Sequence, residues 1–320
     1  MTLTIRRALL VAAVLALAAP ALAQQRAMRV ILPVSAGSGV DAIVRASGNA
    51  LSQSLGHALV IENIPGAGGI SGTSAIVKAP ADGSTIGIVS NNHVTNPAVY
   101  SNLPYDSLAD ITPIAVLGST PFVLVVNPQK LAAKNLAELL ALLKASPGRY
   151  NYASSGNGTI IHFAGAMFVD MAGVDAKHIP YKGVGPMLTD LLGGQVDLGV
   201  VALPAVQGHL KNGTLVAIGL CGASRSPAAP QVPTLAEQGL AGYDVAGWFA
   251  VVGPAHMPAA EVRRIHDAFA AAYATPELKD AMAKQGNDIR VTSPEEAAAF
   301  FRSETAKYSK LAARAGMKID

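Results

Sequence analysis

The sequence predicts an α/β fold made of two consecutive sets of alternating strands and helices. Short apolar runs alternate with segments of helical spacing from residue 29 to residue 90, which is the βαβαβ pattern of a parallel layered sheet. The same alternation starts again after Pro121. No Ser/Pro-rich linker separates the two sets, which indicates domains that share strands rather than domains joined by a tether.

The first set begins with the apolar run 29–34 (RVILPV), which is typical of a strand buried on both faces. A loop at 35–39 follows. Further strands are expected at 58–62 and 85–90, with a helix of small residues ending at Lys78 between them. The helix after the first loop is predicted from apolar residues at helical spacing, namely Val40, Ile43, Val44, Leu51 and Leu55.

The second set is expected to contain strands at 122–126, 150–154, 178–181, 196–203 and 215–220. Its helices are expected at 136–144, from the loop 155–158 through Phe168, at 186–192 and at 204–210. One long strand at 243–252 and three helices at 259–273, 276–285 and 294–315 complete the chain.

Composition excludes several classes of protein. With 51% hydrophobic and 14% charged residues, the chain can bury a core, so intrinsic disorder is excluded. A net charge of +3 over 320 residues is too small for a nucleic-acid-binding surface. The single cysteine excludes an internal disulfide and a multi-cysteine metal site. Because Cys221 follows an apolar run, we expect a buried structural thiol.

The first 23 residues have the three parts of a secretory signal peptide. Arg6 and Arg7 precede an uncharged run of 16 residues that ends in Ala21-Leu22-Ala23. That run is shorter than the roughly 18 to 20 residues that a membrane anchor needs. We therefore expect cleavage after Ala23, export to the periplasm, and a mature chain with a net charge of +1.

Three expected strand-to-helix loops are rich in glycine and small hydroxyl residues, at 35–41, 65–73 and 154–159. Ligands of parallel α/β sheets bind outside the carboxyl ends of the strands, where helix N-termini offer N–H groups to anions. Any one of these loops could be an ordinary turn with an N-cap. Three at matching places favour a shared cleft for a small anion.

The motifs of other functions are absent from the sequence. Neither a dinucleotide fingerprint, nor a P-loop, nor a hydrolase G-x-S-x-G occurs. No two histidines lie three or four residues apart, so no metal or cofactor is expected. Single residues allow two interpretations each. Four residues have a structural role as the default interpretation: Asp41 opposite the helix dipole, His162 as a hydrogen-bonded core residue, Lys182 as a solvated side chain, and Trp248 in core or hinge packing. The alternative for Asp41 is to set the polarity of the cleft, and for His162 and Lys182 it is to contact a ligand.

A series of short motifs runs along the whole mature chain, at 63–69 (NIPGAGG), 81–85 (ADGST), 96–97 (NP), 103–106 (LPYD), 150–159 (YNYASSGNGT), 178–183 (HIPYKG), 190–197 (DLLGGQVD), 225–227 (RSP), 232–234 (VPT), 242–243 (GY), 248–249 (WF) and 293–296 (SPEE). In their order and spacing these motifs resemble the Bug family (TctC-like) of extracytoplasmic solute receptors, the substrate-binding components of tripartite tricarboxylate transporters.

The resemblance implies a two-lobed Venus-flytrap fold like that of type II periplasmic-binding proteins. The first domain would combine residues 24–123 with 247–320, and the second would be 124–246. The strands at 122–126 and 243–252 would then be the two crossovers. The resemblance further implies a monomer that is not an enzyme, and that binds a small carboxylate and presents it to the membrane components of the transporter.

The resemblance also implies which residues form the ligand site. These residues would bind the ligand mostly through backbone amides and hydroxyls. One wall would consist of Val34, Ser35, Ala36, Gly37, Ser38, Gly39, Asp41, Ala67, Gly68 and Asn91. The other would consist of Ser154, Ser155, Gly156, Thr159, Lys182, Gly183, Ala202 and Leu203. The family's first loop usually reads Phe-Pro-Pro-Gly-Gly, whereas this chain has Val-Ser-Ala-Gly-Ser at 34–38, so a smaller and more flexible wall is expected.

Two functions of other classes stay open at this point. The chain could be a sensory partner that presents its ligand-bound state to a membrane signalling receptor, with the same fold and pocket. It could also be an exported hydrolase that uses Ser155 or Ser38, although the sequence lacks a matching His/Asp constellation.

Overall fold

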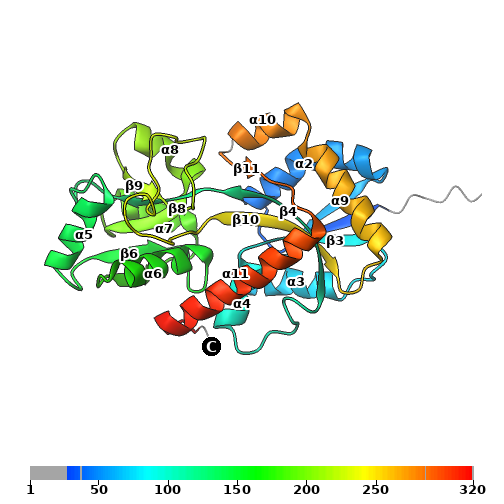
Figure 1. Ribbon diagram of the computed structural model, residues 1–320, viewed down its shortest axis with the longest axis horizontal. Helices are drawn as coiled ribbons and strands as arrows, with labels where there is room; N and C mark the ends of the chain where they lie inside the picture. The colour runs from blue at the N-terminus through cyan, green and yellow to red at the C-terminus, as the bar shows by residue number, and fades with distance from the viewer. Residues whose placement is uncertain (1–26, 37, 285, 319–320) are drawn as a thin grey trace, which may run out of the picture.

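The computed structural model of the chain describes residues 27–318 except Gly37 and Gln285, so the expected signal peptide lies outside the described residues. The described chain forms two β-sheets with helices packed against them, and the sheets lie side by side as two lobes (Figure 1). The strand order is β11-β4-β10-β3-β1-β2 in the first sheet and β7-β6-β8-β5-β9 in the second.

The elements follow the predicted alternation closely. The first lobe contains β1 (Met28–Leu32), α2 (Gly39–Leu55), β2 (Leu59–Asn63), η1 (Ala67–Gly69), α3 (Ile70–Val77), β3 (Thr85–Ser90), α4 (Asn92–Val99), β4 (Ile111–Thr120), β10 (Gly247–Pro254), α9 (Ala259–Tyr273), α10 (Pro276–Lys284), β11 (Asp288–Ile289) and α11 (Pro294–Ala315). The second contains β5 (Phe122–Val126), α5 (Leu136–Ala145), β6 (Asn151–Ser154), α6 (Ile160–Ala172), β7 (Lys177–Pro180), α7 (Val184–Leu192), β8 (Leu198–Ala202), α8 (Leu203–Lys211) and β9 (Val216–Leu220).

The parallel sheet expected from the βαβαβ pattern is confirmed for the first three strands, since β1 pairs in parallel with β2 and β3. β6 likewise pairs in parallel with β7 and β8. The strands at the crossovers between the lobes pair in the antiparallel direction instead. β10 is antiparallel to β3 and β4, and β5 is antiparallel to β8 and β9. Both sheets are therefore mixed.

The chain crosses between the lobes over very short segments. Pro121 alone separates β4 of the first sheet from β5 of the second. On the return, the expected strand 243–252 is shorter at its start, because β10 begins at Gly247. Tyr243 is instead held outside the strand, buried, with its hydroxyl donating to the carbonyl of Ala164 at 2.8 Å. The domain bounds given by the resemblance stay a prediction.

Three elements were not predicted, and all lie in or next to the first sheet. α4 carries buried polar side chains, among them His93, and has Pro97 inside the helix, so it lacks an apolar period. β4 contains Pro113, which the sheet accommodates at a shift in register between Val251 and Val252 of β10. β11 is only two residues long. In each case tertiary contacts, rather than local pattern, fix the element.

One apolar cluster continues from the first lobe into the second. It joins Ile76 of α3 and Phe301 of α11 to Leu124 of β5 and Phe163 of α6. α2 and α9 cover the opposite face of the first sheet, and α7 and α8 cover that of the second. The lobes are therefore joined through packed side chains along α11 and α6.

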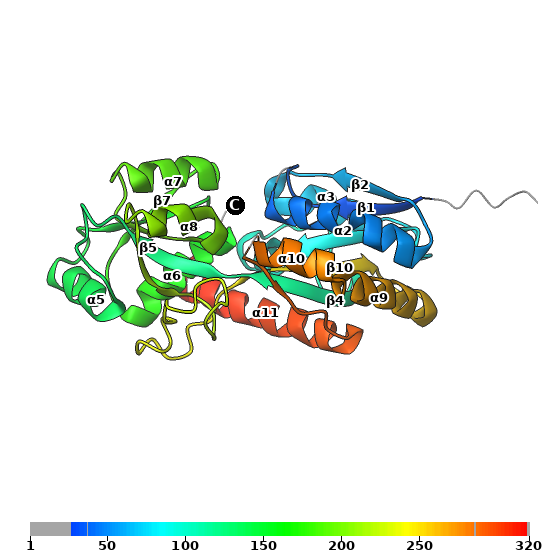
Figure 2. The same ribbon diagram turned by 90° about the horizontal axis from the view of Figure 1, so that it is seen from above.

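Polar and aromatic contacts reinforce this junction. Arg314 of α11 forms an ion pair with Asp170 of α6 at 2.7 Å, and the rings of Tyr308 and Phe163 meet edge to face at 5.3 Å. Figure 2 shows α11 on one side of the crossover strands. It shows α7 and α8 of the second lobe, and α2 and α3 of the first, on the other side.

Candidate functional site

The loop after β1 leads into the N-terminus of α2. Ser38 is the N-cap residue, and its Oγ accepts a hydrogen bond from the N–H of Asp41 at 3.3 Å. Ser35, Ala36 and Gly39 are exposed and Val34 is half-buried, while Gly37 lies outside the described residues. Because the first N–H groups of a helix lack intrahelical acceptors and carry partial positive charge, this end of α2 suits an anion.

Asp41 fixes this loop to the neighbouring strand. Its buried carboxylate accepts hydrogen bonds from Arg45 Nε at 2.9 Å and from Asn63 Nδ2 at 3.0 Å. Asn63 Nδ2 also donates to the carbonyl of Val34 at 3.3 Å, and Arg45 donates to Asn63 Oδ1 at 2.9 Å. The negative charge of Asp41 is therefore compensated within the first lobe, and the network holds the ends of β1 and β2 together.

The glycine-rich loop after β2 packs against the loop after β1. Gly68 adopts a φ of 63°, and its carbonyl accepts a hydrogen bond from Asn96 Nδ2 at 3.1 Å. Ala67 precedes it in the same short 3₁₀ turn. A Cβ atom on Gly72 would lie 2.7 Å from Pro33 Cα and 2.7 Å from the carbonyl oxygen of Ile64. Only glycine permits this close approach of backbones.

Asn91, at the end of β3, is bonded to the second crossover. Its Nδ2 donates to the carbonyl of Ala246 at 3.0 Å, and its Oδ1 accepts from the N–H of Trp248 at 3.0 Å. The residue is 3% exposed. These bonds show a positioning role for Asn91 that the sequence does not reveal, and its contact with a ligand stays a prediction.

We expect Asn91→Ala to lower the free energy of unfolding by about 2 kcal/mol, because two buried backbone groups lose their partner. Asn212→Ala, at the exposed C-cap of α8, is the matched control and should change stability by less than about 0.5 kcal/mol. Urea unfolding followed by circular dichroism measures both. Equal stability of the two variants would contradict the role of Asn91 in holding the crossover.

The second predicted wall is a compact hydrogen-bonded loop before α6. Thr159 is the N-cap residue of α6, and its Oγ1 accepts from the N–H of His162 and donates to the carbonyl of Gly156 at 2.8 Å. Ser155 Oγ donates to Thr159 Oγ1 at 3.1 Å. The carbonyl of Ser155 accepts from the N–H of Gly183 at 3.1 Å. The structure thus brings Ser155, Gly156, Thr159 and Gly183 together.

Behind this loop, the structure reveals a ring stack that the sequence analysis missed. His178 lies between Tyr152 and His162, with ring centroids 5.0 Å and 3.8 Å apart, and its Nε2 meets Ser154 Oγ at 2.6 Å. Burial lowers the pKa of His178 to about 4. Burial and then the neighbouring His178 lower the pKa of His162 to about 4. The expected hydrogen bond of His162 is present, since its Nδ1 accepts from the N–H of Gly158 at 3.2 Å, but the residue is half-buried rather than in the core.

No sequence motif could place this stack, because it depends on sheet register. β6 and β7 pair so that Tyr152 lies opposite His178. His162 comes from the first turn of α6, which packs on both strands. The adjacent Ser154 and His178 resemble half of a hydrolase site, yet Ser154 is fully buried and its hydroxyl is also bonded to Gly156. Ser154 is therefore placed to hold the loop.

The remaining predicted residues lie at two further strand ends. Lys182 is exposed and lies two residues after the end of β7. Ala202 is the N-cap residue of α8, and the N–H of Leu203 donates to the carbonyl of Pro121 at 2.9 Å. This bond ties the start of α8 to the first crossover. Across the lobes, Thr95 Oγ1 of α4 donates to the carbonyl of Gly158 at 3.4 Å, a contact that the sequence analysis did not predict.

The arrangement offers anion-binding groups of one type on both lobes. α2 begins in the first lobe and α6 in the second, each with a hydroxyl N-cap.

Within the residues that the structure describes, no three His, Cys, Asp or Glu side chains gather as metal ligands. None of the helices in the described part of the chain combines the length and hydropathy that a membrane crossing requires.

Two α/β lobes, joined by two short crossovers and carrying loops at the ends of parallel strands, define a two-lobed solute-binding protein. Comparison with known proteins identifies the family of solute-binding proteins. Residues 43–317 match the model of the tripartite tricarboxylate transporter family receptor (TctC), so the chain belongs to that family. It is 32% identical to Protein BugT of Bordetella pertussis, over 92% of this chain and 90% of BugT.

Solved structures agree with this assignment. The periplasmic binding protein BugD superimposes with a TM-score of 0.78 at 28% identity, covering 92% of this chain and 99% of BugD. An adipate-bound protein of R. palustris gives 0.81 at 31% identity, covering 92% and 99% of the two chains. MatC of Rhodopseudomonas palustris, with bound malate, gives 0.76 at 26% identity, covering 90% and 99%. The Venus-flytrap fold is confirmed, and the family and these neighbours are substrate-binding proteins, not enzymes.

Proposed function

We propose that this chain captures a small dicarboxylate between its two lobes in the periplasm and delivers it to the membrane components of a tripartite tricarboxylate-type transporter. The observation that carries the proposal is the pair of helix N-termini, one in each lobe, capped by Ser38 and Thr159. An anion with a carboxylate at each end can accept hydrogen bonds from both. The adipate and malate in two relatives are ligands of this kind.

The charges of the predicted walls also favour recognition through amides and hydroxyls. The carboxylate of Asp41 is already bonded to Arg45 and Asn63, so it is compensated before a ligand arrives. Lys182 is exposed and can meet a carboxylate at the edge of the second wall. A ligand held mainly by backbone N–H groups is released without breaking a buried ion pair, which suits a receptor that must pass its ligand on.

Closure of the lobes follows from the same contacts. A ligand shifts the equilibrium between open and closed forms only by its difference in affinity for them. Groups from both lobes reach one small ligand together only in the closed form, so a dicarboxylate stabilises that form. The membrane components would then recognise the closed form.

Isothermal titration against mono-, di- and tricarboxylates tests the proposal. We expect saturable binding of a C4–C6 dicarboxylate. Ser155→Ala should weaken that binding about three- to tenfold, because one neutral hydrogen bond near the ligand is lost. Ser54→Ala, on an exposed turn of α2 far from the loop, is the control and should leave affinity unchanged. No binding across the whole panel would refute the proposal. Uptake of the bound carboxylate by cells that lack the chain tests delivery separately.

A further inference from the structure

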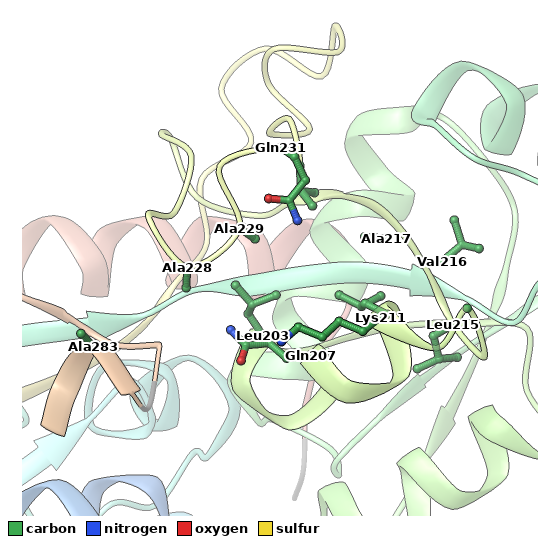
Figure 3. Close-up of a pocket in the computed structure, with 13 residues that line it drawn as sticks. Leu203, Gln207, Lys211, Leu215, Val216, Ala217, Ala228, Ala229, Gln231 and Ala283 are labelled. Carbon is green, nitrogen blue, oxygen red and sulfur yellow. The ribbon is translucent and has the colours of Figure 1, made fainter. Parts of the chain in front are cut away.

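A cavity of about 550 Å³ lies beside α8 in the second lobe and shares only Leu203 with the predicted ligand walls (Figure 3). It is bounded by α8, by the edge strand β9 and by the segment 228–232. Its volume falls within the range of about 300 to 1,000 Å³ that is usual for small-molecule sites. Neither the fold nor the proposed transport cycle requires an opening at this place.

The floor of the cavity is apolar and firmly held. Leu203, Leu215 and Ala229 are almost fully buried. The segment above them is a fixed turn, since the N–H of Ala229 donates to the carbonyl of Ser226 at 3.0 Å and the N–H of Val232 to that of Ala229 at 3.0 Å. Arg225, paired with Glu237, also donates to the carbonyl of Pro230 at 3.1 Å. The cavity is therefore bounded by ordered structure.

The polar groups of the cavity are one cation and two amides. Lys211 is the only charged side chain that lines it, and Gln207 and Gln231 are the other polar ones. Figure 3 shows Gln207 and Lys211 on α8 and Gln231 on the facing segment. Within the part of the chain that the structure describes, Lys211 has no ion-pair partner. Since no carboxylate lines the cavity, its charge complements a single negative group.

From the apolar floor, the lone cation and the two amides, we infer that this cavity binds an amphipathic monocarboxylate. The hydrocarbon part lies on the leucine and alanine side chains. The carboxylate is placed to pair with Lys211 and to accept hydrogen bonds from the amides of Gln207 or Gln231. This site is separate from the walls that hold the transported ligand, and the inference does not depend on the proposed function.

The first lobe also reaches the cavity. Ala283 of α10 lines it, and a Cβ atom on Gly286, in the turn after α10, would lie 3.1 Å from Pro204 Cγ of α8. An occupant of the cavity therefore lies at a place where α8 and α10 approach each other. α8 begins at Leu203, which lines the cavity, directly after Ala202 of the predicted ligand wall, so the two sites lie on either side of one helix end.

Octanoate is a suitable probe, with 1-octanol as its uncharged counterpart. We expect octanoate to bind the full-length mature protein in a saturable manner in isothermal titration, with an affinity that does not change when adipate is added in excess. Lys211→Met should weaken octanoate binding about fivefold and leave octanol binding unchanged, because only the charge is lost. Lys144→Met, at another exposed lysine in the last turn of a helix, is the matched control and should have no effect.

Ala228→Trp provides an independent second variant, because Ala228 is exposed at the rim and its replacement fills the cavity without touching the core. This variant should abolish the binding of both probes and keep the melting temperature of the parent. Three results would each overturn the inference: no saturable octanoate binding at millimolar concentration, equal affinity of the parent and Lys211→Met, or octanoate binding that survives Ala228→Trp.

Discussion

Replacing Gly72 with alanine should lower the free energy of unfolding by about 2 to 3 kcal/mol. The new Cβ would lie 2.7 Å from two backbone atoms, Pro33 Cα and the carbonyl oxygen of Ile64. Backbone atoms cannot rotate away as a flexible side chain can, so the loops after β1 and β2 must move apart. Both loops belong to the first predicted wall, so dicarboxylate affinity should fall together with stability.

Gly48→Ala is the matched control for this change. Gly48 lies inside α2, and a Cβ atom there would have no heavy atom within 4 Å. Alanine should therefore raise the free energy of unfolding by about 0.5 to 1 kcal/mol, since a helical glycine costs backbone entropy. Urea unfolding measures both variants. If Gly72→Ala were as stable as the parent, the proposed contact between the two loops would be wrong.

Acidification should destabilise the protein well before its carboxylates titrate. His93 is fully buried between Tyr105 and Phe301, with its Nε2 bonded to the carbonyl of Ser107 at 2.7 Å. Burial lowers the pKa of His93 to about 4. Between pH 6.5 and 4 the unfolded chain binds a proton that the folded chain does not. Stability contributed by neutral His93 is therefore complete above pH 6.5 and falls by roughly 3 kcal/mol by pH 4.

Urea midpoints at pH 7 and pH 5.5 give the test, because few carboxylates titrate in that window. Going from pH 7 to pH 5.5 should lower the free energy of unfolding, because His93, His162 and His178 all have lowered pKa values in the folded chain. In His93→Phe the loss between the two pH values should be smaller by about 1 kcal/mol, whatever the stability of the variant at pH 7. An unchanged difference between the two pH values would show that His93 does not remain neutral in the fold.

Elements with an apolar period of their own could be predicted from the sequence. The pattern at 259–273 and 294–315 yields α9 and α11 with the observed bounds, and the runs at 85–90 and 122–126 yield β3 and β5. α4 and β4 could not be predicted, because contacts with residues distant in the sequence stabilise them. His93 of α4 needs the carbonyl of Ser107, and Pro113 of β4 needs the irregular pairing with β10.

The candidate site shows a similar division. Helix N-termini with hydroxyl caps can be predicted from local sequence, as Ser38 and Thr159 show. The hydrogen-bond partners of Asp41 and Asn91 could not be predicted from local sequence. These partners are Asn63, Ala246 and Trp248, which lie far from them along the chain. Local sequence thus locates groups that can meet an anion, whereas the bonds that hold them in place depend on the fold.

Trp248 gives the protein an optical property of its own. It is the single tryptophan of the chain, and it lies at the second crossover with its indole N–H donating to Glu304 at 3.1 Å. Its ring meets Phe300 and Phe301 of α11, and its backbone N–H is bonded to Asn91. Because Trp248 lies where the chain crosses between the lobes, we expect closure of the lobes on a ligand to change the emission of this one fluorophore. Stopped-flow emission of the unlabelled protein can therefore follow lobe motion in real time, without an attached dye.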